Sequence, residues 1–110
     1  MIDVEAWAWG RVSDLGGMKV WLVDSASEWP FRVERSVLQV DVRASSKKSA
    51  FDRAVTARDR LVREADDHYP SGGVIAATRM VSGPAWLPDD SGGPRYVLRV
   101  EVDSHPVDAG

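Results

Sequence analysis

The clearest alternation of hydrophobic and polar positions lies in residues 31–44. From Leu38 onward every second residue is apolar and those between are polar, which is typical of a strand with one buried and one solvated face. The alternation changes phase between Val37 and Leu38. We therefore expect a bulge or a turn near Arg35 and Ser36 to divide this segment.

Three shorter segments have the composition of strands, namely residues 18–23, 74–81 and 96–102. The last of them alternates regularly between apolar and polar positions. Polar or turn-rich stretches follow the first two, so we expect loops over residues 24–30 and 83–94.

Apolar residues recur at helical spacing in residues 3–15 and 45–65. Asp3 is suited to cap the first helix, and the glycine pair at residues 16–17 is suited to end it. The serine pair at residues 45–46 offers a similar cap to the second helix. That helix also carries a solvated and mostly cationic face.

This order of elements predicts an α+β fold, in which a mostly antiparallel β-sheet of about four to five strands packs against two helices. We expect one domain over residues 1–104 and a flexible C-terminal tail over residues 105–110. With both helices on one face, the polar positions of the longest and the last strand point away from them. These positions are Gln39, Asp41, Arg43, Arg99, Glu101 and Asp103.

Composition narrows the function classes. Hydrophobic residues make up 44% and charged residues 28% of the chain, which is typical of a globular protein. The absence of cysteine excludes disulfides and thiol chemistry, and the net charge of -3 argues against a dedicated nucleic-acid binder. No apolar run approaches the roughly 20 residues of a membrane span, so we expect a protein made in the cytoplasm. Five tryptophans are many for this length, and we expect most of them in the core.

One stretch resembles a catalytic motif. Residues 90–94 (Asp-Ser-Gly-Gly-Pro) match most of the sequence around the nucleophile of chymotrypsin-like serine proteases. That mechanism also needs a histidine base and a buried aspartate. The two histidines are His68, which we place at the end of the second helix, and His105, in the expected tail. We interpret the stretch as a turn and predict no catalytic residue.

Metal and phosphate sites are also not indicated. The run from Asp89 to Ser91 lacks the spacing of a calcium loop, and His68 with its neighbouring aspartates at residues 66–67 does not form a converging ligand set. Neither glycine pair, at residues 16–17 or 72–73, has the spacing of a phosphate-binding loop. We therefore predict no metal, no cofactor and no enzymatic activity.

The second half of the chain combines several short features in a particular order. They are the strand at residues 39–44, a helix with Ala50, Ala54 and Leu61, Gly83-Pro84, the loop Trp86-Leu87-Pro88-Asp89, the segment at residues 93–97, a strand at residues 100–102, and His105-Pro106. This succession, over about residues 29–106, resembles the tail terminator proteins of long-tailed (siphovirus-type) bacteriophages, particularly those that infect actinobacteria.

The resemblance implies an antiparallel sheet packed against helices, in agreement with the pattern above. It further implies a structural virion protein that forms a homo-oligomeric ring, usually a hexamer. The ring caps the finished tail tube and joins it to the head-completion (stopper) protein, with DNA only as passing cargo in its lumen. It implies no membrane, no catalytic residues and no cofactors.

A head-to-tail ring needs two different complementary patches on each subunit. The cationic face of the second helix and the acidic loop near residues 89–90 have opposite charge, and tryptophans beside prolines on loops are suitable anchors. The candidate interface residues are Trp29, Pro30, Arg53, Arg60, Trp86, Pro88, Asp89, Asp90 and Arg95.

Three alternatives remain open. Another phage head–tail joining or tail-completion protein has a similar size and fold. A small monomeric module that binds a ligand or a peptide belongs to a different class and needs a preformed pocket. An enzyme needs titratable groups that converge on the polar sheet face, from Asp41, Arg43, Glu101 and Asp103; such residues more often form a cross-strand charge ladder.

Overall fold

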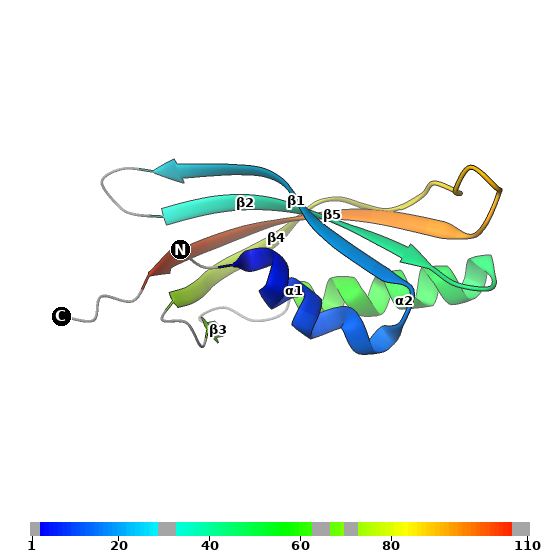
Figure 1. Ribbon diagram of the computed structural model, residues 1–110, viewed down its shortest axis with the longest axis horizontal. Coiled ribbons are helices and arrows are strands. Elements are labelled where there is room, and N and C mark those ends of the chain that lie inside the picture. The colour runs from blue at the N-terminus through cyan, green and yellow to red at the C-terminus, as the bar shows by residue number, and fades with distance from the viewer. Residues whose placement is uncertain (1–2, 29–32, 63–66, 70–72, 107–110) are drawn as a thin grey trace.

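The computed structural model describes residues 3–28, 33–62, 67–69 and 73–106, and it has two layers. A twisted antiparallel sheet forms one layer, and two helices cover one of its faces (Figure 1). The predicted α+β fold is therefore confirmed. The elements are α1 (Val4–Val12), a short 3-10 turn (Ser13–Leu15), β1 (Met18–Glu28), β2 (Val33–Arg43), α2 (Lys47–Leu61), β3 (Asp67–Tyr69), β4 (Gly73–Trp86) and β5 (Arg95–Pro106).

The strands lie in the order β1-β2-β5-β4-β3, and every neighbouring pair is antiparallel. Strand β2 pairs with β5 without interruption from Glu34 to Arg43, so the predicted division near Arg35 and Ser36 is wrong. The phase change arises because Ser36 occupies a core position, where it is only 3% exposed, while Val37 lies on the opposite face. A polar residue at a buried position and a bulge both produce the same change of phase in the hydrophobic alternation of the sequence.

The register shifts occur instead in the two strands that were predicted too short. Strand β1 has one shift, between Leu22 and Asp24, and β4 has three shifts between Ile75 and Ala85. Both strands extend into segments predicted as loops, because bulges keep the strands paired where the alternation is broken.

Both helices begin as predicted. The carboxylate of Asp3 accepts a hydrogen bond from the backbone N–H of Ala6 at 2.9 Å, and the hydroxyl of Ser46 accepts one from Ser49 at 3.1 Å. Each bond satisfies a backbone donor that has no partner within the helix. Gly16 and Gly17, both at positive φ, lead the chain from the 3-10 turn into β1.

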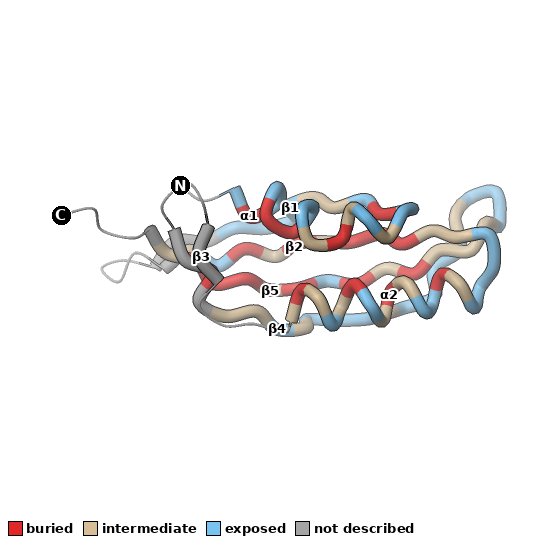
Figure 2. The backbone as a smooth tube through the Cα atoms, turned by 90° about the horizontal axis from the view of Figure 1, so that it is seen from below, coloured by how far each residue is buried: buried red, intermediate tan, exposed pale blue. Residues whose placement is uncertain are grey.

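The core lies between the helices and the sheet (Figure 2). Three alanines of α2 are fully buried and let the helix approach the strands closely; they are Ala50, Ala54 and Ala57. Of the four tryptophans whose side chains are described, Trp7 is buried, whereas Trp9 and Trp86 are 47% and 40% exposed. The expectation that most tryptophans lie in the core is therefore wrong for this set.

The two histidines both lie in strands. His68 belongs to β3 and pairs with Val74 of β4, so its placement at a helix end is wrong. Val74 also pairs with His105 of β5, and Ser104 is only 1% exposed. The predicted boundary at residue 104 therefore lies inside β5, which runs to Pro106; residues 107–110 lie outside the described part.

Candidate protein-binding surface

The hairpin of β4 and β5 ends in a loop whose backbone is held by its own hydrogen bonds. The N–H of Leu87 donates to the carbonyl of Arg95 at 3.0 Å, and the N–H of Asp89 donates to Gly93 at 3.1 Å. Gly92 closes the turn by donating to Asp89 at 2.8 Å. The loop at residues 87–94 is therefore a defined continuation of the hairpin, which projects at one end of the molecule (Figure 1).

The Asp89 carboxylate organises this turn. Its Oδ1 accepts hydrogen bonds from the Ser91 hydroxyl at 2.7 Å, from the Gly93 N–H at 2.7 Å and from the Ser91 N–H at 3.0 Å. Arg43 lies 3.8 Å from the other oxygen. The pKa of Asp89 is lowered below its ordinary value of 3.8. The largest cause is the hydrogen bond from the Ser91 hydroxyl, and the backbone N–H donors and Arg43 add to it. The predicted turn is confirmed.

A pH dependence follows from this lowered pKa. The carboxylate stabilises the turn fully above pH 3.8, and the contribution is lost as the pH falls below 3.8 through the pKa of the folded protein. We expect the amide NMR signals of Ser91 and Gly93 to shift together in that range. In Asp89→Asn, this titration should be missing at every pH; its persistence would show that another group holds the turn.

Next to the loop, aromatic side chains from α2, β4 and β5 form a partly exposed group. The ring of Tyr96 contacts Phe51 and Trp86, with centroids 5.4 and 5.3 Å apart, and the Lys47 ammonium lies 4.7 Å from the Trp86 ring. Phe51, Trp86 and the adjacent Leu87 are 44%, 40% and 51% exposed. We call Lys47, Phe51, Trp86, Leu87 and Tyr96 the hairpin-end cluster. Large apolar groups held in place by neighbours are typical anchors for a protein partner.

The open face of the sheet carries ion pairs, as the alternation predicted. Arg79 of β4 contacts Glu101 at 2.9 Å and Asp103 at 2.7 Å on the neighbouring strand. Asp103 Oδ1 accepts no hydrogen bond, but it lies 3.3 Å from Nε of Arg35. The carboxylate of Asp103 is thus placed between two guanidinium groups from the strands on either side.

A second group of charges lies further along the same face. Arg95 donates to Asp41 at 3.1 Å, Gln39 donates to it at 3.2 Å, and Arg43 lies 4.0 Å away. The Asp41 side chain is only 3% exposed although it lies on the open face, because these longer side chains cover it. Asp41, Glu101 and Asp103 of this face each contact at least one arginine, as in a cross-strand charge ladder, whereas Arg99 contacts Gln39 and Lys19 lies over Trp21. In the part of the chain that the structure describes, no group of three or more His, Asp or Glu could hold a metal ion.

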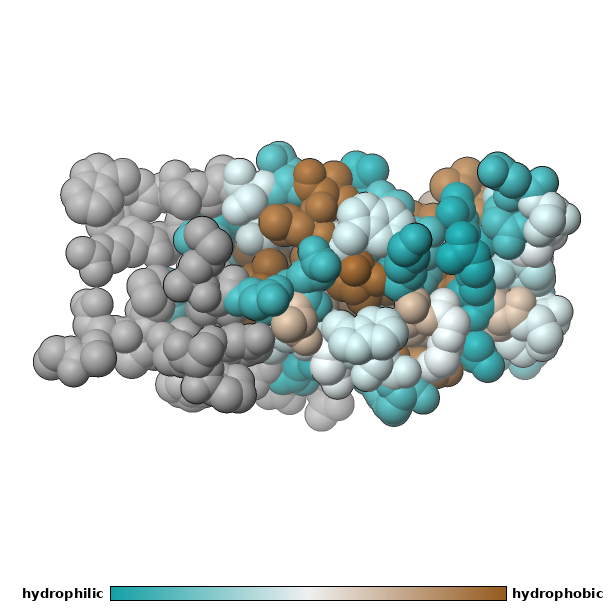
Figure 3. Space-filling model, in the orientation of Figure 1, coloured by the Kyte–Doolittle hydropathy of each residue, from teal (hydrophilic) through white to brown (hydrophobic). Residues whose placement is uncertain are grey.

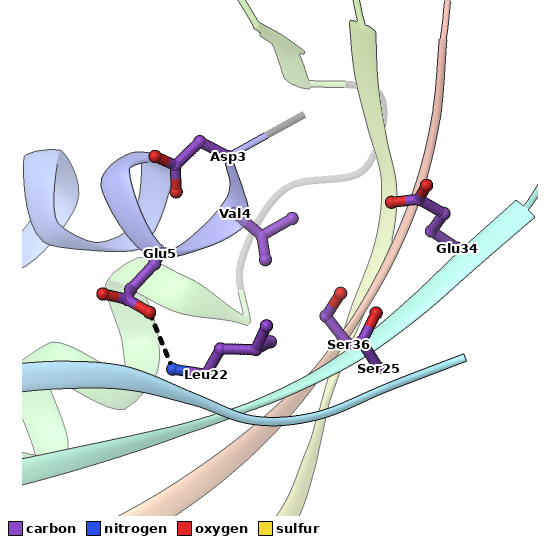
Figure 4. A pocket seen from close by; sticks show the side chains of 7 residues that line it. All are labelled: Asp3, Val4, Glu5, Leu22, Ser25, Glu34 and Ser36. Atoms are coloured by element: carbon purple, nitrogen blue, oxygen red, sulfur yellow. Dashed lines mark hydrogen bonds between the residues drawn. The ribbon is translucent and has the colours of Figure 1, made fainter. Parts of the chain in front are cut away.

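A cavity of about 290 Å³ opens between α1 and the outer strands (Figure 4). Asp3, Val4 and Glu5 line it from the helix, and Leu22, Ser25, Glu34 and Ser36 from β1 and β2. Glu5 also accepts a hydrogen bond from the backbone N–H of Leu22 at 2.9 Å. The lining combines three carboxylates with apolar groups, which suits a cationic side chain.

The candidate interface residues fall into three groups. Trp86, Pro88 and Asp90 are exposed at the hairpin end. In the second group, the three candidate arginines and Asp89 use their charged groups in contacts within the subunit. Arg53 donates to the carbonyls of Gly16 and Arg43, Arg60 pairs with Asp14, and Arg95 pairs with Asp41. Trp29 and Pro30 lie outside the described residues.

Sequence reasoning missed several exposed apolar residues. Phe51 follows the helical spacing of the apolar residues within residues 45–65, but it is 44% exposed. Leu22 and Val23 lie in the edge strand β1, and Val81 lies in β4 beyond the three residues that pair with β3. These side chains are 42%, 41% and 53% exposed. Their alternation only indicates a strand, and exposure depends on which strands end up at the edges.

No protein-family model matches this chain, and no curated protein matches it. Among residues 3–28, 33–62, 67–69 and 73–106, no helix is long and apolar enough to cross a membrane.

Proposed function

We propose that this protein is a structural component of a bacteriophage virion. In this proposal it is a tail terminator that forms a ring at the end of the tail tube, and the resemblance to tail terminator proteins implies a hexamer. The observation that carries the proposal is the hairpin-end cluster, a set of exposed apolar side chains next to a loop fixed by internal hydrogen bonds. In this role the hairpin end contacts the tail tube or the stopper protein, and DNA passes through the lumen.

Two further features support this role. The sequence elements that resemble tail terminators include Trp86 and Gly93, which border the hairpin loop. The polar sheet face is covered by paired charges, which suits a wall that meets solvent or other chains. Another head–tail joining protein is the closest alternative, and its position in the particle distinguishes it.

The proposal predicts that the protein binds the ends of purified tail tubes and stops their elongation. Trp86→Ala should weaken tube-end binding about 30-fold, since truncation of a central aromatic anchor commonly removes about 2 kcal/mol or more. Binding is measured by counting labelled tube ends in negative-stain images across a concentration series.

Trp21→Ala serves as the matched control, because Trp21 lies on the open face beside Lys19, away from the hairpin end. It should bind tube ends like the wild type, and circular dichroism should show that both variants are folded. A wild-type protein that neither binds tube ends nor limits tube length would contradict the proposed function.

A further inference from the structure

The two long edges of the molecule are both partly apolar, and they differ in charge. Helix α1 and strand β1 form one edge, and helix α2 and strand β4 form the other (Figure 2). Figure 3 views the first of these, where hydrophobic residues are exposed between hydrophilic ones. Each edge is as long as the helices and strands that form it.

We call the first edge the acidic edge. Its apolar part consists of Trp9, Leu22 and Val23, which are 47%, 42% and 41% exposed. The 290 Å³ cavity lies beside Leu22, and its described lining residues include three carboxylates and no cation. Asp24 adds a fourth exposed carboxylate in β1.

We call the second edge the basic edge. The side of α2 that faces β4 presents Lys47, Phe51, Val55, Arg58 and Val62 at helical spacing. A hollow of about 410 Å³ runs between this side and the strand, lined by Arg58, Asp59, Val62 and Met80. Arg58 is ion-paired with Asp59 at 3.1 Å, so the positive charge that the edge offers a partner comes from Lys47. Val81, which follows Met80 in β4, is 53% exposed.

The backbone of these edges is not suited to continue the sheet into a neighbour. At the acidic edge, the Glu5 carboxylate already accepts the N–H of Leu22 next to the bulge. At the basic edge, β4 has three register shifts and contains Pro84, which lacks an N–H group. Bulges, proline and inserted charges are the usual means of preventing pairing between edge strands. These features disfavour strand pairing at both edges and favour contacts made by side chains.

We infer that the acidic edge of one copy docks against the basic edge of the next, and that the cavity beside α1 receives a basic side chain from α2 of that neighbour. Both surfaces belong to the same chain and match in charge and in apolar character, so a second copy covers both at once. Such a contact joins two different surfaces, and it gives a ring when the rotation between neighbouring copies closes and an open filament when it does not. The inference deepens the proposed function, because it names the subunit contact of the ring.

Two variants test the contact. Val23→Arg adds a cation to the acidic edge, and Val81→Glu adds an anion to the basic edge. Both positions are exposed, so the fold should be kept. Light scattering behind a sizing column should show a ring for the wild type, in solution or after release from tube ends, and monomers for each variant alone.

The mixture of the two variants gives the decisive result. Each variant retains one native edge, and the two changed edges now carry opposite charges. An equimolar mixture should therefore assemble again, as heterodimers or alternating rings. Arg99→Glu on the open face is the matched control and should form rings like the wild type. Rings from either edge variant alone, or a mixture that stays monomeric, would overturn the inference.

The tube-end experiment separates this inference from the proposed function. If the edge variants and their mixture behave as expected but the rings ignore tube ends, the subunit contact stands and the tail terminator role fails. If a wild-type monomer binds tube ends without forming a ring there, the subunit contact fails and tube binding stands. A monomer that binds lysine-rich peptides in the cavity would instead indicate a binding module, and would overturn the inferred contact.

Discussion

Arg95→Met is expected to lower the free energy of unfolding by about 3 kcal/mol, since removal of one partner from a buried ion pair leaves an uncompensated charge. Asp41 is 3% exposed and depends on Arg95, which lies 3.1 Å away and is itself only 21% exposed. Gln39 and the more distant Arg43 remain after the change and keep the loss at the lower end of the usual range. Urea denaturation followed by circular dichroism measures the loss.

The double variant Asp41→Leu with Arg95→Met provides the control. Two apolar side chains of similar volume remove both charges, and such replacements are often neutral or stabilising. We therefore expect the double variant to recover most of the stability that Arg95→Met loses. If Arg95→Met alone loses less than about 1 kcal/mol, solvent or Arg43 must compensate the Asp41 charge, and the ion pair is not essential.

Asp41 also illustrates what the sequence could predict. Its position between Val40 and Val42 places it on the polar face of β2, and the structure confirms this placement. Its burial could not be predicted, because the covering side chain of Arg95 comes from a strand 54 residues away. Alternation determines the face of a residue, whereas burial on that face depends on which strands become neighbours.

In the candidate protein-binding surface, too, local features could be predicted from the sequence, whereas contacts between distant segments could not. The hairpin loop and the exposure of Pro88 follow from local turn chemistry, so they could be predicted from the sequence. The contact of Phe51 with Tyr96 could not be predicted, because α2 and the β4–β5 hairpin approach each other only through the tertiary fold. The apolar residues of the sheet edges were missed for a related reason. A strand has the same pattern at the edge as in the centre of a sheet.

A single added methyl group is expected to be strongly destabilising at Gly83, within the irregular part of β4. Gly83 has a φ of +91°, and an added Cβ would meet the carbonyl oxygen of Val97 and lie 2.9 Å from the Cα of Leu98. Both atoms belong to the backbone of β5, where the Leu98 side chain is fully buried. Gly83→Ala must therefore strain the backbone and push β4 away from β5, which together cost about 3 kcal/mol or more.

Gly92→Ala is the matched control for this prediction. Gly92 also has a positive φ, of +81°, but no atom lies within 4 Å of an added Cβ. Only the backbone strain applies there, so the loss should be about 1–2 kcal/mol. Equal losses in the two variants, measured by urea denaturation, would show that β5 does not restrict Gly83. Because Trp86 follows three residues later in β4, Gly83→Ala should also weaken tube-end binding, whereas Gly92→Ala should leave the Trp86 and Tyr96 rings in contact.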